Sequence, residues 1–74
     1  MTLTDYAAQH HITLLRDDLS YLRSRLESIP KPQRASLLKD YVQVWCHHRD
    51  SCNNAIRADN EGRRAANIWL RTVT

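Results

Sequence analysis

Histidine and cysteine side chains cluster in two short stretches of the chain, and transition-metal binding is the first chemistry that this clustering suggests. His48 and Cys52 are four residues apart, so they share one face if they lie on a helix. If the chain before residue 30 folds back on the chain after it, His11 approaches them, which gives His11, His48 and Cys52 as candidate ligands. The sequence has no CxxC or HxxxH pair of the kind found in structural zinc sites. We therefore favour no metal and no cofactor, and interpret Cys52 as a small apolar core residue.

Arginine and asparagine side chains recur near the C-terminus at helical spacing, which is the pattern of a nucleic-acid-binding helix. The candidates are Arg63, Arg64, Asn67 and Arg71. Such a face could contact phosphates and base edges, and the net charge of +3 is compatible with this. Asp59 and Glu61 interrupt the positive charge and would repel phosphate. A DNA- or RNA-binding regulatory protein is therefore the alternative hypothesis, and a solvated helix face is the simplest interpretation of the pattern.

Motifs typical of enzymes are missing from the sequence. With one glycine in 74 residues there is no glycine-rich phosphate loop, and no Ser-His-Asp or paired-carboxylate pattern stands out. A single short domain also offers little concave surface from which water is excluded. We predict that the protein is not an enzyme.

Apolar and aromatic residues beyond what one helical hairpin buries favour protein binding. Ala7, Leu14 and Tyr21 recur every seven residues on a stripe that faces away from the main apolar seam. Val44 belongs to a second, wide apolar face, and Trp69 to the last amphipathic segment. We expect Leu14, Tyr21, Val44 and Trp69 to bind a protein partner, with a homodimer as one form of this binding. The alternative is that all of these side chains are buried in one helical core. Trp69 is the residue whose loss we expect to matter most.

A long N-terminal helix is the element expected to position Leu14 and Tyr21. Its apolar residues alternate between spacings of four and three, which is a heptad pattern typical of an amphipathic helix. These residues are Ala8, Ile12, Leu15, Leu19, Leu22, Leu26 and Ile29. Pro30 ends the pattern, because a residue before proline is pushed out of the helical region. The sequence predicts a helix over about 4–29 and an antiparallel second helix over about 32–58.

A break must separate the second helix from the amphipathic segment that follows it. Two stretches are candidates: residues 50–54, which are poor in helix formers, and residues 60–62, which end in the single glycine. A third, shorter helix is expected over about 62–72. The predicted fold is therefore a single all-α domain over 1–74, a three-helix bundle for which dimerisation is a further option. If neither stretch breaks the second helix, that helix must dimerise to cover its end.

Cysteine usage and hydropathy indicate a cytoplasmic protein. On one helix, Cys46 and Cys52 would be about 9 Å apart, which is too far for a disulfide. No apolar run approaches the roughly 20 residues of a membrane span, and we expect no signal peptide. We therefore expect no membrane association.

Two strings of the sequence resemble segments of small early-region and replication-related proteins of temperate phages. They are NEGRRAANIWLR at residues 60–71 and IPKPQRASLL at residues 29–38, and together they cover about a third of the chain. The resemblance implies an accessory protein of a phage or mobile element that inhibits or adapts a host protein.

Overall fold

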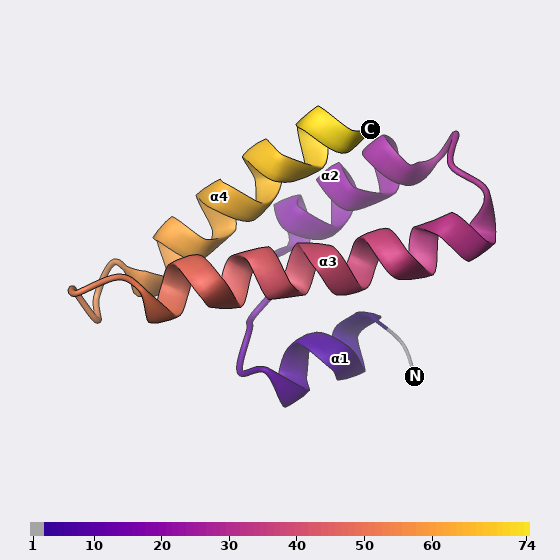
Figure 1. Cartoon of the computed structure of the whole chain (residues 1–74). Coiled ribbons are helices and arrows are strands. Elements are labelled where there is room, and N and C mark those ends of the chain that lie inside the picture. The colour runs from indigo at the N-terminus through magenta and orange to yellow at the C-terminus, as the bar shows by residue number, and fades with distance from the viewer. Residues whose placement is uncertain (1–2) are drawn as a thin grey trace.

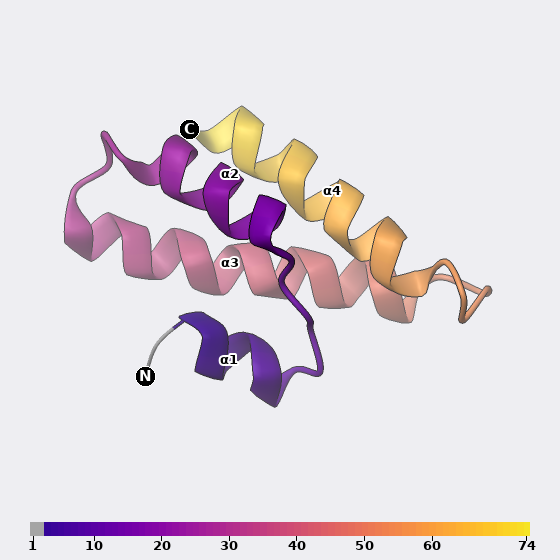
Figure 2. The same cartoon turned by 180° about the vertical axis from the view of Figure 1, so that it is seen from behind.

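The chain is all-helical over the part that the structure describes. The computed structural model describes residues 3–74, which form four helices and no strand. The helices are α1 (Leu3–Gln9), α2 (Arg16–Leu26), α3 (Lys31–Asp50) and α4 (Ala58–Val73). In Figure 1, α3 runs through the middle, with α2 and α4 on one side of it and α1 on the other, and Figure 2 shows the same arrangement from behind. The predicted all-α class is confirmed, with four helices over residues 3–74 in place of the three expected.

The prediction of one long N-terminal helix is wrong, because the chain breaks between α1 and α2. His11 has a φ of 59°, in the left-handed region, which histidine adopts more readily than most residues other than glycine. Ile12 and Thr13 follow, and both are β-branched and therefore weaker helix formers than leucine or alanine. Arg49 of α3 donates a hydrogen bond to the carbonyl oxygen of His10 and so holds the turn in place.

The break changes which residues face the core. α2 begins after Leu15, whose backbone N–H donates a hydrogen bond of 2.9 Å to Oδ2 of Asp18. Leu15 and Leu19 lie on the predicted apolar seam, yet they are 52% and 38% exposed. Ala7 belongs to the predicted outer stripe, yet its side chain is only 1% exposed. The seam and the stripe predicted across this region are therefore not continuous faces.

The second predicted helix also ends early, and the third begins early. α3 ends at Asp50 rather than near residue 58, so the chain breaks at the stretch that is poor in helix formers. α4 starts at Ala58 and contains Gly62, which is buried. A Cβ atom on Gly62 would lie 2.5 Å from Cδ1 and 2.7 Å from the carbonyl oxygen of Trp45. Gly62 therefore marks a close approach of α3 and α4, not a helix end.

Trp45 lies at the centre of the core. The largest fully buried side chains are Trp45, Tyr41, Leu70 and Val42. The other buried apolar residues are Ala7, Ile12, Leu22, Leu26 and Ala66. Trp69, which we expected to matter most, is only partly buried and packs against the edge of this core. The fold thus buries one tryptophan and leaves part of the other in contact with solvent.

Candidate protein-binding surface

Arg63, a candidate for nucleic-acid binding, is used inside the protein. Its Nε donates a hydrogen bond of 2.9 Å to Oδ2 of Asp18, a carboxylate that is buried between α2 and α4. Its other guanidinium nitrogens donate to Oδ1 of Asn60 at 2.8 Å and to the carbonyl oxygen of Thr13 at 3.3 Å. The guanidinium also lies over the ring of Trp45, 4.9 Å from its centroid. These contacts tie α4 to α2 and to the connector before it.

Asn67 is also bound internally. The phenol of Tyr41 donates a hydrogen bond of 2.7 Å to Oδ1 of Asn67, which is half-buried. Burial raises the pKa of Tyr41 well above its ordinary value of 10.0, and the negative charge of Asp18 raises it further. Two of the four residues predicted to bind nucleic acid are therefore engaged in contacts between helices.

Three further arginines cap the carboxyl ends of helices to which they do not belong. Arg49 caps α1, Arg34 caps α2 and Arg25 caps α4. The acceptors are the carbonyl oxygens of His10, Glu27 at 2.9 Å and Arg71 at 3.0 Å. A cation at a helix C-terminus satisfies carbonyl groups that have no partner within the helix and complements the helix dipole, which stabilises by about 0.3–1 kcal/mol. Much of the positive charge is therefore engaged in contacts within the fold.

The candidate metal ligands are not brought together. Among residues 3–74, no group of three or more His, Cys, Asp or Glu side chains is arranged to hold a metal ion, so His11, His48 and Cys52 do not form the hypothetical site. His48 and Cys52 line a hollow beside the loop between α3 and α4. Cys46 and Cys52 are not joined to each other, and they do not share a helix as the sequence-based distance assumed, because Cys46 lies on α3 and Cys52 in the loop after it.

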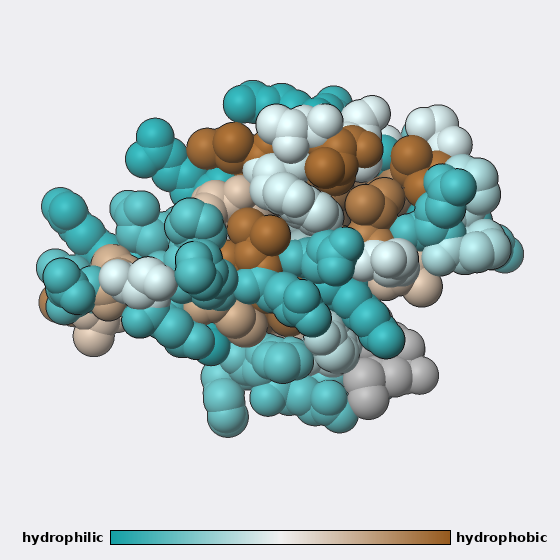
Figure 3. Space-filling model, in the orientation of Figure 1, coloured by the Kyte–Doolittle hydropathy of each residue, from teal (hydrophilic) through white to brown (hydrophobic). Residues whose placement is uncertain are grey.

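A hollow between α3 and α4 unites two of the residues predicted to bind protein. Val44 and Trp69 line this hollow of about 350 Å³. The other lining residues are Asp40, Gln43, His47 and His48. Ile68, next to Trp69 on α4, is 44% exposed. Figure 3 shows hydrophobic side chains over α4 and along its border with α3, with hydrophilic residues around them. We call Val44, Ile68 and Trp69 the α3–α4 patch.

The other two residues predicted to bind protein lie elsewhere. Leu14 lines a separate small hollow beside α1 and the start of α2. Tyr21 is half-buried on α2, with the guanidinium of Arg25 6.0 Å from its ring centroid. Ile68, which the sequence analysis missed, completes the α3–α4 patch. The sequence does carry a signal for it, because Ile68 lies four residues after Arg64 and three before Arg71 and therefore shares their helical face.

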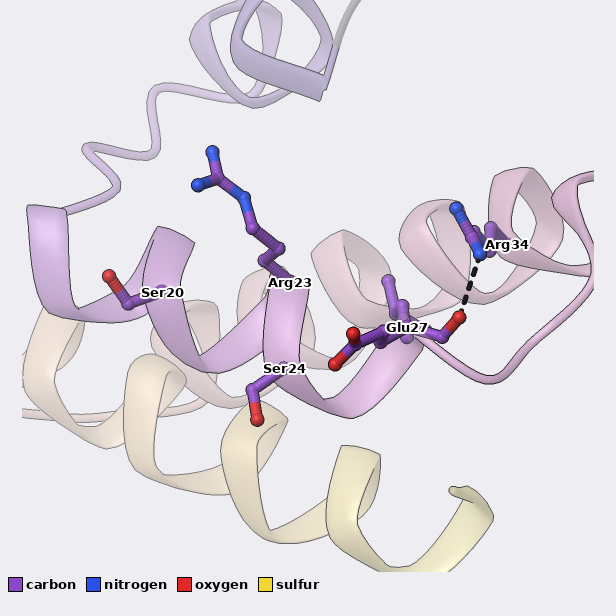
Figure 4. A pocket seen from close by; sticks show the side chains of 6 residues that line it. Ser20, Arg23, Ser24, Glu27 and Arg34 are labelled. Atoms are coloured by element: carbon purple, nitrogen blue, oxygen red, sulfur yellow. Dashed lines mark hydrogen bonds between the residues drawn. The ribbon is translucent and has the colours of Figure 1, made fainter.

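A hollow beside α2 and the start of α3 is lined mainly by polar side chains, but these side chains do not point towards a common position. It measures about 440 Å³ and is lined by Ser20, Arg23, Ser24, Leu26, Glu27 and Arg34. Figure 4 shows Arg34 turned onto the main-chain carbonyl of Glu27, whereas Arg23 extends away from it. The two cations do not aim at one point, so the hollow lacks the geometry of an anion site.

Comparisons with known proteins add no family. No protein-family model, no curated protein sequence and no solved structure matches the chain. Within residues 3–74, none of the helices combines the length and the apolar character that crossing a membrane requires. The candidate function therefore depends on the surface itself.

Proposed function

We propose that this protein is a small, non-enzymatic protein-binding module whose α3–α4 patch docks an amphipathic helix of a partner protein. The observation that carries the proposal is the hollow that Val44 and Trp69 line together, with Ile68 exposed beside it. A partly exposed tryptophan beside smaller apolar side chains is the composition of an interface anchor, because tryptophan is enriched among residues that dominate binding energy.

The charges around the patch favour an acidic partner helix. Arg64, Ile68 and Arg71 follow spacings of four and three on α4, so they share one face, and all three are exposed. A partner helix with apolar residues towards Trp69 and acidic residues at its flanks would complement this surface. Asp40 at the rim of the hollow would repel a phosphate backbone, and it would equally repel an acidic side chain. The acidic residues of the partner helix should therefore face Arg64 and Arg71 and not the rim formed by Asp40.

The nucleic-acid alternative loses support from the internal contacts. Arg63 and Asn67 are bound within the fold, which leaves Arg64 and Arg71 as the exposed members of the predicted set. Two separated cations give a weak, salt-sensitive contact with phosphates. Protein binding is therefore the hypothesis that the surface supports better.

The wider function that we propose is that of an accessory protein of a phage or mobile element, acting in the cytoplasm on a host protein as an inhibitor or adaptor. This part of the proposal depends on the resemblance of two short strings. We further propose that α2, α3 and α4 act as a three-helix bundle that presents the α3–α4 patch on a rigid support.

The test is site-specific photo-cross-linking in cells that express the protein. A photoreactive phenylalanine analogue at position 68 is expected to cross-link a protein, and Trp69→Ala should reduce that product by about tenfold or more. The same analogue at position 39, which is exposed on α3, serves as the matched control. Cross-linking to nucleic acid, or to a protein whose capture is unchanged by Trp69→Ala, would overturn the proposal.

A further inference from the structure

An apolar hollow lies where the chain breaks between α1 and α2, away from the α3–α4 patch. It measures about 210 Å³ and is lined by Ala7, Ala8, Ile12, Thr13, Leu14 and Leu19, none of which carries a charge. Leu14 is thus one of the residues predicted to bind protein that the α3–α4 patch does not include. An apolar cavity of about 150 Å³ holds a benzene ring, so this hollow has room for one leucine or phenylalanine side chain. We call it the connector hollow, after the connector of residues 10–15.

The apolar surface continues beyond the connector hollow along the start of α2. Leu15 directly precedes this helix and is 52% exposed, and Leu19 is 38% exposed. The two leucines are four residues apart and therefore lie on the same side of the helix. Exposed apolar residues that are contiguous with each other and with a hollow indicate an interaction site, whereas single exposed ones do not.

Two cations flank Leu19 on the exposed face of α2. Arg16 precedes Leu19 by three residues and Arg23 follows it by four, so both share its face, and both are exposed. Figure 4 shows Arg23 leaving α2 on the side of α1 and the connector. Asp17 does not neutralise them at this face, because two residues of helical rotation place it on nearly the opposite side of α2 from Leu19.

Neither of the two cations is used by the fold. Within residues 3–74, no hydrogen bond or ion pair holds Arg16 or Arg23, in contrast to the four arginines that connect helices, which are Arg25, Arg34, Arg49 and Arg63. Arg23 suits the dipole of α2 in its last turn, but Arg16 has the wrong sign for the first turn. Asp5, three residues before Ala8 on α1, has an interaction of its own within the chain. The positive charge at this face is therefore available to a ligand.

We propose that the connector hollow is a second protein-binding site, which takes one leucine or phenylalanine side chain from an acidic segment of a partner protein. The carboxylates of that segment pair with Arg16 and Arg23. Charge complementarity selects this occupant, because both unpaired cations border an uncharged hollow. They are seven residues apart, which is about 10 Å along the helix axis, so carboxylates on either side of one apolar side chain would reach both. A nucleic acid would meet the cations but has no apolar side chain to fill the hollow.

This second site and the α3–α4 patch lie on different faces of the molecule. In Figure 2 the connector crosses in front of α3, whereas Figure 3 shows the α3–α4 patch from the opposite side. No residue lines both hollows. One chain can therefore hold two partner segments at once, as an adaptor does. The inference is independent of the proposed function, because it uses none of the residues of the α3–α4 patch.

The experiment selects ligands for the full chain from a library of random peptides displayed on yeast. One group of enriched peptides is expected to carry a leucine or phenylalanine between aspartates or glutamates. Leu19→Ser should raise the Kd of this group by about tenfold, measured by fluorescence anisotropy of the synthesised peptides. Ile68→Ser, at an exposed position of the α3–α4 patch, is the matched control and should leave the Kd unchanged. Circular dichroism verifies that both variants keep their helix content.

Charge reversal tests the pairing with the acidic residues. Arg23→Glu should raise the Kd of the same peptides about fivefold or more, whereas Arg64→Glu, the same change at an exposed position of α4, should leave it unchanged. Equal effects of these two variants would overturn the inference, and so would the absence of peptides that depend on Leu19. Tighter Leu19-dependent binding to phosphatidylserine vesicles or to a single-stranded oligonucleotide would also overturn it. Acidic peptides that depend on Ile68 alone would contradict this second site and leave the proposed function standing.

Discussion

Replacing Gly62 by alanine separates what helix propensity predicts from what the packing predicts. In an isolated helix the change should stabilise by about 1 kcal/mol, because alanine is the better helix former. In this fold the new Cβ atom would lie 2.5 Å from Cδ1, 2.7 Å from the carbonyl oxygen and 2.9 Å from Nε1 of Trp45. We expect the packing effect to dominate and Gly62→Ala to destabilise the protein.

The size of the effect follows from these three contacts. Carbon atoms in contact normally lie about 3.5–4.0 Å apart, so the methyl group overlaps the fully buried indole of Trp45 by about 1 Å. Overpacking of this kind typically costs about 1–3 kcal/mol. The cost should lie in the upper part of that range, since a main-chain oxygen cannot rotate away. After subtraction of the propensity gain, the net loss is about 1–2 kcal/mol, which corresponds to a Tm lower by about 4–16 °C.

Urea and thermal unfolding followed by circular dichroism measure this loss. The matched control compares Arg64→Ala with Arg64→Gly at an exposed position of the same helix, where alanine should be the more stable by about 1 kcal/mol. The preference for glycine at position 62 and for alanine at position 64 is the expected result. A rise in stability for Gly62→Ala would refute the close approach of α3 and α4.

Three further predictions concern the polar contacts. Asp18→Ala should lower the free energy of unfolding by about 3 kcal/mol, which is the lower end of the cost of breaking a buried ion pair. Urea unfolding measures this loss. The control Asp17→Ala, at an exposed position, should change the free energy of unfolding by less than about 0.5 kcal/mol. Arg49→Gln should speed amide hydrogen exchange in α1 and leave exchange in α4 unchanged, because it removes the cap on α1 alone. Because the folded pKa of Tyr41 is raised, its phenol contributes stability that is fully present below the ordinary pKa of 10.0 and falls as pH rises above it. Tyr41→Phe should therefore flatten the decline of stability above about pH 10 in alkaline unfolding curves.

Periodicity predicts helices well here, but it does not predict where the first helix breaks. The apolar pattern continues through residues 10–15, with Ile12 and Leu15 at the expected spacing. The turn is stabilised by Arg49, which is distant in sequence and can be recognised only once α1 lies against α3. By contrast, the break after Asp50 follows local composition, so the sequence could offer it as one of two candidates. The first break therefore combines weak local helix propensity at Ile12 and Thr13 with a tertiary contact of Arg49, whereas local propensity was sufficient to suggest the second.

The candidate site was predictable only in part for a related reason. Spacing places Val44 and Trp69 on apolar faces, but their meeting in one hollow requires the register of α3 against α4. Spacing likewise groups Arg63 with Arg64, although one is held by a buried carboxylate and the other is exposed. The sequence gives no sign that Asp18 is buried, because acidic residues at the start of a helix are usually solvated and serve the helix dipole.

The internal use of arginine connects the stability of this small protein with its surface. A chain of 74 residues buries a small core, so bonds between helices contribute a larger share of its stability than in a large domain. Arg25, Arg34, Arg49 and Arg63 supply such bonds to carbonyl groups and to one buried carboxylate. The cations on the outer face of α4 are then Arg64 and Arg71, on either side of an exposed isoleucine. An apolar and acidic protein face matches a surface of that composition better than a continuous line of phosphates does. The reason is that burying the apolar centre favours binding through the release of water rather than through charge.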